Sequence, residues 1–159
     1  MRRLMALALM AVGIAAIPAA QAQEKKTPYW ASISAGEAMM RTGPGRNYPA
    51  TWLYKRADLP VKVVEVYPQW RKVQDPGGTT GWMLVNLLSD TRTAIVQGTE
   101  PAPLHEAPRA ESKIRYRAEP GVVGRLSECT VDWCRFDVGK RGGFIRTGNI
   151  WGTDPGESF

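Results

Sequence analysis

Short runs of β-branched and aromatic residues, separated by turn-forming residues, recur along this chain. The runs lie at 61–67, 70–74, 80–84, 122–128, 133–138 and 142–146. The breaks between them are rich in Gly, Pro and Asp, as in Pro68-Gln69, residues 75–78 and residues 139–142. Runs of this kind are typical of antiparallel strands joined by tight turns. After the N-terminal region no segment keeps a helical apolar period beyond about two turns, so the pattern predicts an all-β protein.

The strand pattern occurs twice. Trp70 is matched by Trp133, 63 positions later, and Asn86-Leu87-Leu88 is matched by Asn149-Ile150-Trp151 at the same offset. Gly81-Trp82-Met83 and Gly143-Phe144-Ile145 match with a shift of one residue. Several landmarks at nearly one offset indicate a tandem duplication. Each unit has about 60 residues and is expected to form a small antiparallel barrel. Units of this size are marginal alone, so packing between them should add stability.

The repeat suggests domain boundaries. We expect a first unit at 29–97, a linker at 98–103, a second unit at 104–152 and a flexible tail at 153–159, which is polar and contains Pro and Gly. The linker is too short for a flexible tether, which favours a semi-rigid pair of units. Residues 92–96 form a further strand candidate that could complete either barrel.

The N-terminus predicts export. Arg2 and Arg3 precede an apolar run over residues 4–17, and Ala20-Gln21-Ala22 follows with small residues where a signal peptidase cleaves. This arrangement is typical of a secretory signal peptide, here 1–22. The run is shorter than the roughly 20 residues of a membrane span, so no transmembrane anchor is expected in the mature chain. We therefore expect a secreted, periplasmic protein.

The net charge and the two cysteines limit which partners and metals we expect the protein to bind. The formal net charge is +6, and +4 once Arg2 and Arg3 leave with the signal peptide. Outside the cytoplasm a basic surface favours wall polymers or lipid headgroups over nucleic acid, or it serves solubility alone. Cys129 and Cys134 are placed to face each other across a four-residue hairpin loop, which predicts a disulfide. One C-x4-C and a single His cannot supply four zinc ligands, so neither a metal nor a cofactor is expected.

Motifs in the first unit resemble the bacterial SH3-like domain family, which occurs in tandem form in exported proteins of Gram-negative bacteria. The resemblance rests on residues 40–45 (Met-Arg-Thr-Gly-Pro-Gly), Tyr48-Pro49, Trp70 with Val73, and Gly81-Trp82. It implies an SH3-like fold and a binding module, because some members sit beside wall-degrading domains and bind peptidoglycan. The second unit departs from this pattern, with residues 105–108 (His-Glu-Ala-Pro) replacing the first motif and Phe144 replacing the second tryptophan.

Strand alternation suggests where a ligand would bind. If Val73 and Phe136 face the barrel cores, Trp70 and Trp133 point away from them. An outward Trp can stack on a sugar ring or on an extended peptide; alternatively, it covers a barrel end or packs between the units. Trp82 heads an apolar strand and is expected in the core. The candidate ligand-binding residues are Trp70, Tyr54, Lys55, Tyr48 and Trp133.

Catalysis is not expected. The only histidine, His105, should lie at the surface near the linker, and the two cysteines should be oxidised, so a Cys–His nucleophile cannot form. A pair of carboxylates would need a deep cleft, which small barrels rarely provide. The sequence thus predicts a non-catalytic exported module that recognises peptidoglycan or another cell-envelope component. The alternative is a periplasmic adaptor that binds an envelope protein or peptide.

Overall fold

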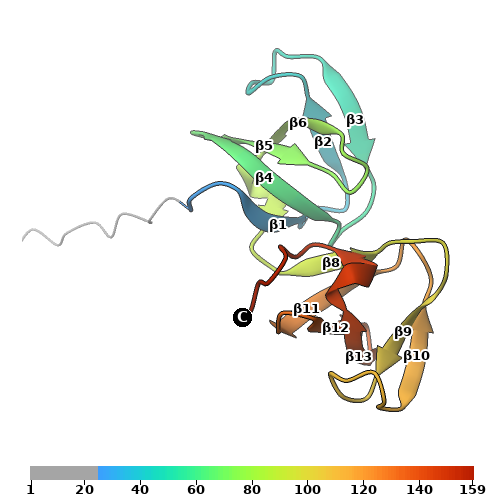
Figure 1. Ribbon diagram of the computed structural model, residues 1–159. Helices are drawn as coiled ribbons and strands as arrows, with labels where there is room; N and C mark the ends of the chain where they lie inside the picture. Colours follow the sequence, from blue (N-terminus) through green and yellow to red (C-terminus); the bar gives the residue numbers. More distant parts are fainter. Residues whose placement is uncertain (1–24) are drawn as a thin grey trace, which may run out of the picture.

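The computed structural model describes residues 25–159 and shows two β-sheet units joined end to end (Figure 1). The predicted signal peptide lies outside these residues. Within 25–159 there are two short 3₁₀ helices and no α-helix, and no helical segment there has the length and apolarity to cross a membrane. Each unit is a sheet of seven antiparallel strands, which confirms the prediction of an all-β protein with two SH3-like barrels.

The first sheet spans residues 29–89 in the strand order β3-β2-β6-β5-β4-β1-β7. Its elements are β1 (Tyr29–Ile33), β2 (Ala38–Arg41), β3 (Ala50–Tyr54), β4 (Pro60–Tyr67), β5 (Trp70–Gln74), β6 (Thr80–Leu84), η1 (Val85–Leu87) and β7 (Leu88–Ser89). Its turns lie at the residues where the sequence predicted turns. The Asp75 carboxylate accepts the Thr79 backbone N–H at 2.8 Å in the β5–β6 turn, where Gly78 has a φ of 87°.

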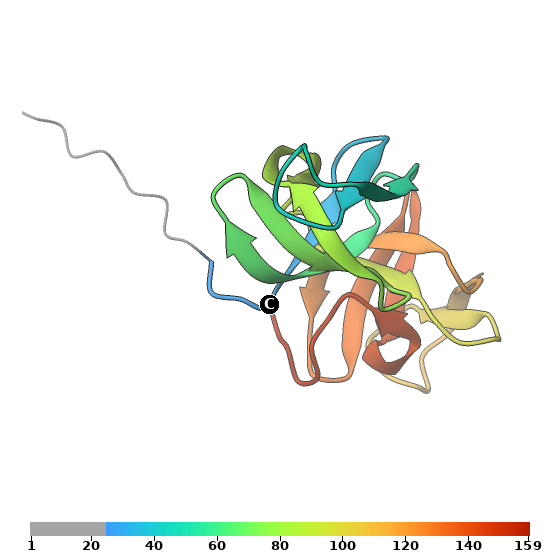
Figure 2. The same cartoon turned by 90° about the horizontal axis from the view of Figure 1, so that it is seen from above.

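The second sheet repeats this order as β10-β9-β13-β12-β11-β8-β14. Its elements are β8 (Thr93–Val96), β9 (Ala102–His105), β10 (Ile114–Ala118), β11 (Val123–Cys129), β12 (Trp133–Val138), β13 (Arg141–Arg146), η2 (Thr147–Asn149) and β14 (Ile150–Trp151). Seen from above, the two units overlap in the view, with the first in blue to green and the second in yellow to red (Figure 2).

The strand register corrects one detail of the predicted repeat. Ile33 pairs with Leu88 in the first sheet, and Val96 pairs with Ile150 at the same place in the second. Leu88 is therefore equivalent to Ile150, so matching Asn86-Leu87-Leu88 with Asn149-Ile150-Trp151 is wrong by one residue. The cause is the β5–β6 turn, which has one residue more than the β12–β13 turn between equivalent strand pairs.

Strand pairing divides the units elsewhere than at the expected linker. β8 pairs with β11 and β14 of the second sheet, through contacts such as Ile95 with Val123, and it is the counterpart of β1. Residues 93–96 thus open the second unit instead of closing the first. The expected linker at 98–103 connects β8 to β9, and only residues 90–92 join the sheets.

Each unit has its own core, and one pair of core positions shows how the repeats diverged. Val61 and Val73 are fully buried in the first core. The equivalent residues in the second are Gly124 and Phe136, by their pairing with β8 and β13. A Cβ atom on Gly124 would lie 2.6 Å from the Phe136 ring. The ring therefore occupies the space that a valine side chain uses in the first unit.

Apolar contacts join the two units. Ile95 and Val123 of the second sheet pack against the core of the first. The Trp30 and Trp151 rings pack edge to face, with their centroids 4.7 Å apart and their planes at 89°. At another point of the junction Arg125 forms an ion pair with Asp58 at 3.3 Å. These contacts join the two units at three places.

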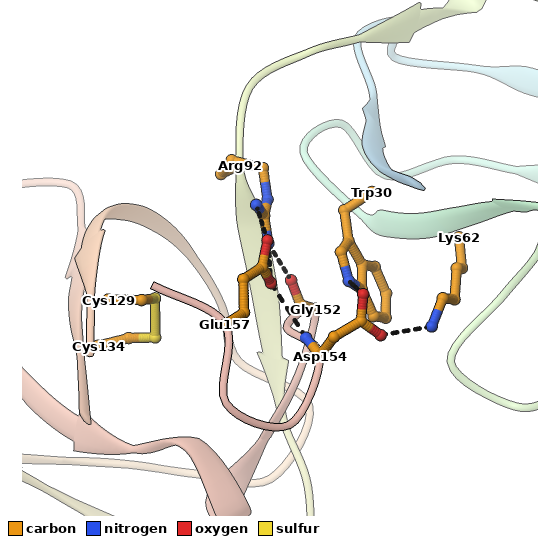
Figure 3. A network of polar contacts seen from close by, with 8 residues as sticks. All are labelled: Trp30, Lys62, Arg92, Cys129, Cys134, Gly152, Asp154 and Glu157. Carbon is orange, nitrogen blue, oxygen red and sulfur yellow. Dashed lines mark hydrogen bonds and ion pairs between the residues drawn. A yellow bond between two sulfur atoms is a disulfide. The ribbon is translucent and has the colours of Figure 1, made fainter. Parts of the chain in front are cut away.

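The C-terminal segment, expected to be a flexible tail at 153–159, is instead packed at the junction of the units (Figure 3). Asp154 accepts hydrogen bonds from the Trp30 indole N–H at 3.0 Å and from the Lys62 ammonium, both in the first unit. Glu157 accepts two hydrogen bonds from the Arg92 guanidinium at 2.7 and 2.9 Å. The tail therefore binds the first unit through Asp154 and the segment between the two sheets through Glu157.

The predicted disulfide is confirmed. Cys129 and Cys134 are bonded, with Cα atoms 4.1 Å apart, and they pair directly between β11 and β12. The same region holds the end of the chain, because Phe159 and Cys129 exchange two backbone N–H···O hydrogen bonds of 2.9 and 3.1 Å. The C-terminal tail is thus hydrogen-bonded to the disulfide hairpin through its backbone.

Candidate functional site

The two predicted outward tryptophans lie opposite the core face but are not exposed. Trp70 and Trp133 are each only 7% exposed, whereas Val73 and Phe136 on the alternate face are fully buried. Neither tryptophan belongs to the apolar core clusters. Alternation therefore placed both side chains on the correct face, and other parts of each unit cover them.

A loop folded the same way in both units lies near each tryptophan. In the first unit it spans residues 42–49, and the Arg41 guanidinium donates to the Tyr48 carbonyl oxygen at 2.8 Å. In the second unit His105 replaces Arg41, and its Nδ1 lies 3.0 Å from the Ser112 carbonyl oxygen. A carbonyl only accepts, so Nδ1 carries the proton. His105 was expected at the surface, but it is only 7% exposed. Its hydrogen bond to Ser112 holds this loop.

The first unit has an open groove beside Trp70. The groove has a volume of about 430 Å³ and is lined by Arg46, Gln69, Trp70, Leu84, Val85 and Asn86. Its residues come from the 42–49 loop, the β4–β5 turn and the segment from β6 into η1. The Val85 N–H donates to the Gln69 carbonyl oxygen at 3.0 Å, which ties the last two together.

The groove combines several binding groups. Arg46 takes part in no ion pair among residues 25–159, and it is exposed together with Gln69 and Asn86. The Trp70 indole N–H has no acceptor in the described chain and is not among its fully buried polar groups. The site thus offers one cation and two amide side chains beside Trp70 and the aliphatic residues Leu84 and Val85.

In the second unit a cation and a histidine ring pack on the corresponding tryptophan. The Arg146 guanidinium lies 4.7 Å from the centre of the Trp133 ring, and the His105 ring meets the same tryptophan edge to face at 5.1 Å. Arg146 is the counterpart of Leu84, since each pairs with the tryptophan of its own unit. In the second unit the Arg146 guanidinium therefore lies over the Trp133 ring at the position that Leu84 takes beside Trp70 in the first.

The other candidate residues lie apart from this groove. Tyr54 belongs to the first core, and its hydroxyl donates to Asp75 at 2.8 Å; burial, then this hydrogen bond and the Asp75 charge, raises the pKa of Tyr54. Lys55 is exposed and forms an ion pair with Glu37 at 3.6 Å. Tyr48 is 43% exposed and lies two residues from Arg46, with its ring against the Gly43 backbone.

Sequence reasoning missed the polar residues of the groove. Arg46, Gln69 and Asn86 come from three separate turns, and only the folded loop brings them together. Their position next to the family-like motifs was the available signal.

Trp82, expected in the core, is 8% exposed but packs with Tyr67 at a ring distance of 6.4 Å, while its neighbour Met83 enters the core.

Comparison with known proteins identifies the class. The model of the family described as "Bacterial SH3 domain" matches residues 34–90 and again residues 98–152. The two matches cover more than half of the chain. The protein belongs to the bacterial SH3 domain family and carries two copies of the domain, which confirms the resemblance found in the sequence. Domains of this family are binding domains. No curated protein matches the chain.

Three solved structures are similar to the chain at low identity. They are an NlpC/P60 family protein from Bacillus cereus ATCC 10987 (15% identity, 77% of this chain and 56% of that chain, TM-score 0.35) and two proteins from Trichomonas vaginalis. The latter are NlpC2 (12%, 80% and 49%, TM-score 0.35) and NlpC1 (12%, 81% and 47%, TM-score 0.34). The chain spans about half the length of the proteins it matches.

Proposed function

We propose that this protein is a non-catalytic binding module of the cell envelope that recognises a wall polymer, peptidoglycan above all, through the groove beside Trp70. The observation that supports this most is the grouping of Arg46, Gln69, Asn86 and Trp70 around one open groove. Bacterial SH3 domains bind cell-wall components, which agrees with this assignment.

The chemistry of the wall suits these groups. Peptidoglycan consists of sugar strands with short peptides that end in carboxylates. Arg46 can hold a carboxylate, and the two amide side chains can bond acetamido or peptide groups. Trp70 is 7% exposed, so little of its ring is open to a stacking ligand. We therefore propose recognition of the peptide carboxylates and amides more than stacking of a sugar ring.

Three observations support an extracytoplasmic location. The Cys129–Cys134 disulfide is typical of proteins from oxidising compartments. The family and the N-terminal segment that the sequence predicts to be a signal peptide point the same way. We assign the protein to the periplasm on this basis.

The positions of His105 and the cysteines support a non-catalytic role. His105 is buried, fixes the Ser112 carbonyl and packs on Trp133, and both cysteines are bonded to each other. A Cys–His catalytic pair cannot be assembled from these residues.

Retention on purified sacculi tests the proposal. Trp70→Ala would remove a buried side chain and risk unfolding, so the variant of choice is Arg46→Glu with Asn86→Ala, at two exposed positions. The matched control is Arg56→Glu, which makes the same charge change at an exposed loop residue outside the groove. We expect wild type and control to sediment with sacculi and the groove variant to remain in solution. Equal retention of all three would refute the groove, and no retention would refute wall binding.

A second candidate function is an adaptor for an envelope protein. β3 lies at the edge of the first sheet and carries Trp52 and Leu53, which are 59% and 40% exposed. An extended peptide could add to such an edge. Cross-linking from position 52 in cells to one reproducible protein, unchanged after wall digestion, would support this function over wall binding.

A further inference from the structure

The second unit has an open pocket where the first unit is filled by a tyrosine. Tyr54 pairs with Ala38 at the end of β3, and Ala118 pairs with Ala102 at the end of β10, so the two positions are equivalent. Tyr54 is 7% exposed and its hydroxyl donates to Asp75. By register with β13, Val138 is the counterpart of Asp75. Ala118 and Val138 neither fill this space nor form that hydrogen bond.

The resulting pocket has a volume of about 270 Å³. Its apolar floor and wall include Leu104 and Ala118, which are 3% and 5% exposed, and Val138. Its rim carries Arg117, Glu119 and Arg141, all of them exposed. The pocket shares no lining residue with the groove beside Trp70, which lies in the other unit.

The volume of the pocket limits the size of the apolar part of a ligand. The volume lies just below the roughly 300–1,000 Å³ of pockets for drug-sized molecules, so it suits a single ring. The repeat gives the same answer independently, because the first unit places a phenol ring at the equivalent position. An aromatic ring entering the second pocket would meet the counterparts of the residues that surround Tyr54.

The charge of the pocket rim indicates which polar group the ligand carries. Two arginines and one glutamate give the rim a formal charge of +1. Neither Arg117 nor Arg141 forms an ion pair with another residue of 25–159, nor does Glu119. Both guanidinium groups are therefore available to a carboxylate, which they can hold through paired N–H donors.

We propose that the second unit binds a single aromatic ring that bears a carboxylate, with the ring over Ala118 and the carboxylate at Arg117 and Arg141. The ligand chemistry could come from a free aromatic acid or from a peptide that ends in an aromatic residue. This site is separate from wall binding by the first unit, and each can fail without the other.

Titration of the ¹⁵N-labelled chain without its predicted signal peptide tests the proposal, with 3-phenylpropionate as the probe. We expect saturable amide shifts at Leu104, Ala118 and Val138, with a Kd of about 1 mM or lower, as befits one ring and one ion pair. The neutral 3-phenylpropanol should bind about fivefold more weakly, as should the probe to Arg141→Gln. A peptide ending in Phe, compared with its C-terminal amide, distinguishes the peptide source from the free acid.

The decisive variant fills the pocket instead of disrupting it. Ala118→Tyr with Val138→Asp installs the Tyr54–Asp75 pair of the first unit, and it should fold and lose the probe-induced shifts. Retention of binding by this folded variant would overturn the proposal. So would shifts that map to Arg46 and Trp70, or the lack of any shift at about 10 mM probe, where a ligand bound by roughly 2.7 kcal/mol would half-saturate.

Discussion

The Gly124–Phe136 pair of the second core makes the strongest stability prediction. Gly124→Val alone forces a side chain into space where a Cβ already lies 2.6 Å from the ring, and overpacking of this kind costs about 1–3 kcal/mol. Phe136→Val alone empties part of a fully buried site and should cost about 2–3 kcal/mol, below the range for Phe→Ala because valine keeps some volume. The double variant recreates the Val61–Val73 pair and should cost about 1.5 kcal/mol or less.

Urea unfolding of the wild type and the three variants completes a double-mutant cycle. The coupling free energy should favour the double variant by at least about 1.5 kcal/mol, since neighbours that share one space are not additive. The reciprocal exchange in the first unit, Val61→Gly with Val73→Phe, is the matched control and should show coupling of the same sign. Additive free energies in the second unit, within about 0.5 kcal/mol, would refute the idea that the two residues exchange volume.

Three further predictions concern the disulfide hairpin and the tail. Replacing Cys129 and Cys134 by Ser should lower the free energy of unfolding by roughly 2 kcal/mol, the chain-entropy value for so short a loop; an unchanged urea midpoint would contradict this. Hydrogen bonds from Arg92 and from the Asp154 N–H outweigh burial and lower the pKa of Glu157, so its contribution is present above the unfolded pKa and disappears as the pH falls through the folded one. The stability gap between wild type and Glu157→Gln should therefore close in acid, and a gap constant from pH 7 to about 3 would argue against it. Asp154→Ala should speed hydrogen exchange at the Trp30 indole, because that N–H loses its acceptor, and an unchanged exchange rate would show that the tail does not protect it.

Much of the fold could be predicted because the relevant signals are local. Alternating apolar residues and Gly-rich turns define strands, the repeat of Trp70 at Trp133 defines two units, and the spacing of Cys129 and Cys134 defines the hairpin disulfide. The strands and the disulfide depend on residues close together in the chain, and the repeat is visible when one half of the sequence is compared with the other. The strand pairing, the disulfide and the family match agree with them.

The parts that could not be predicted depend on contacts between distant residues. The tail is polar, yet it is ordered because Asp154 meets Trp30, 124 residues away in the sequence, and Glu157 meets Arg92. Trp70 and Trp133 point away from the cores as alternation predicts, yet neighbouring segments bury them. Strand period assigns a face, but it does not show what later covers that face.

The candidate site shows the same limit. Trp70 was predicted and lines the groove, but Tyr54 lies in the core, and Arg46, Gln69 and Asn86 were not anticipated. These three residues share no sequence pattern, since each occupies a different turn. Their grouping becomes visible only when the loop over residues 42–49 is folded beside the β4–β5 turn.

The most direct test of wall recognition is an NMR titration of the ¹⁵N-labelled protein with soluble muropeptides that carry free peptide carboxylates. We predict saturable shifts at the amides of Arg46, Gln69 and Asn86 and at the Trp70 indole N–H, with the equivalent residues around Trp133 unchanged. Amidation of the muropeptide carboxylates should weaken these shifts. Shifts confined to the second unit, or none in the groove at saturating muropeptide, would contradict the account.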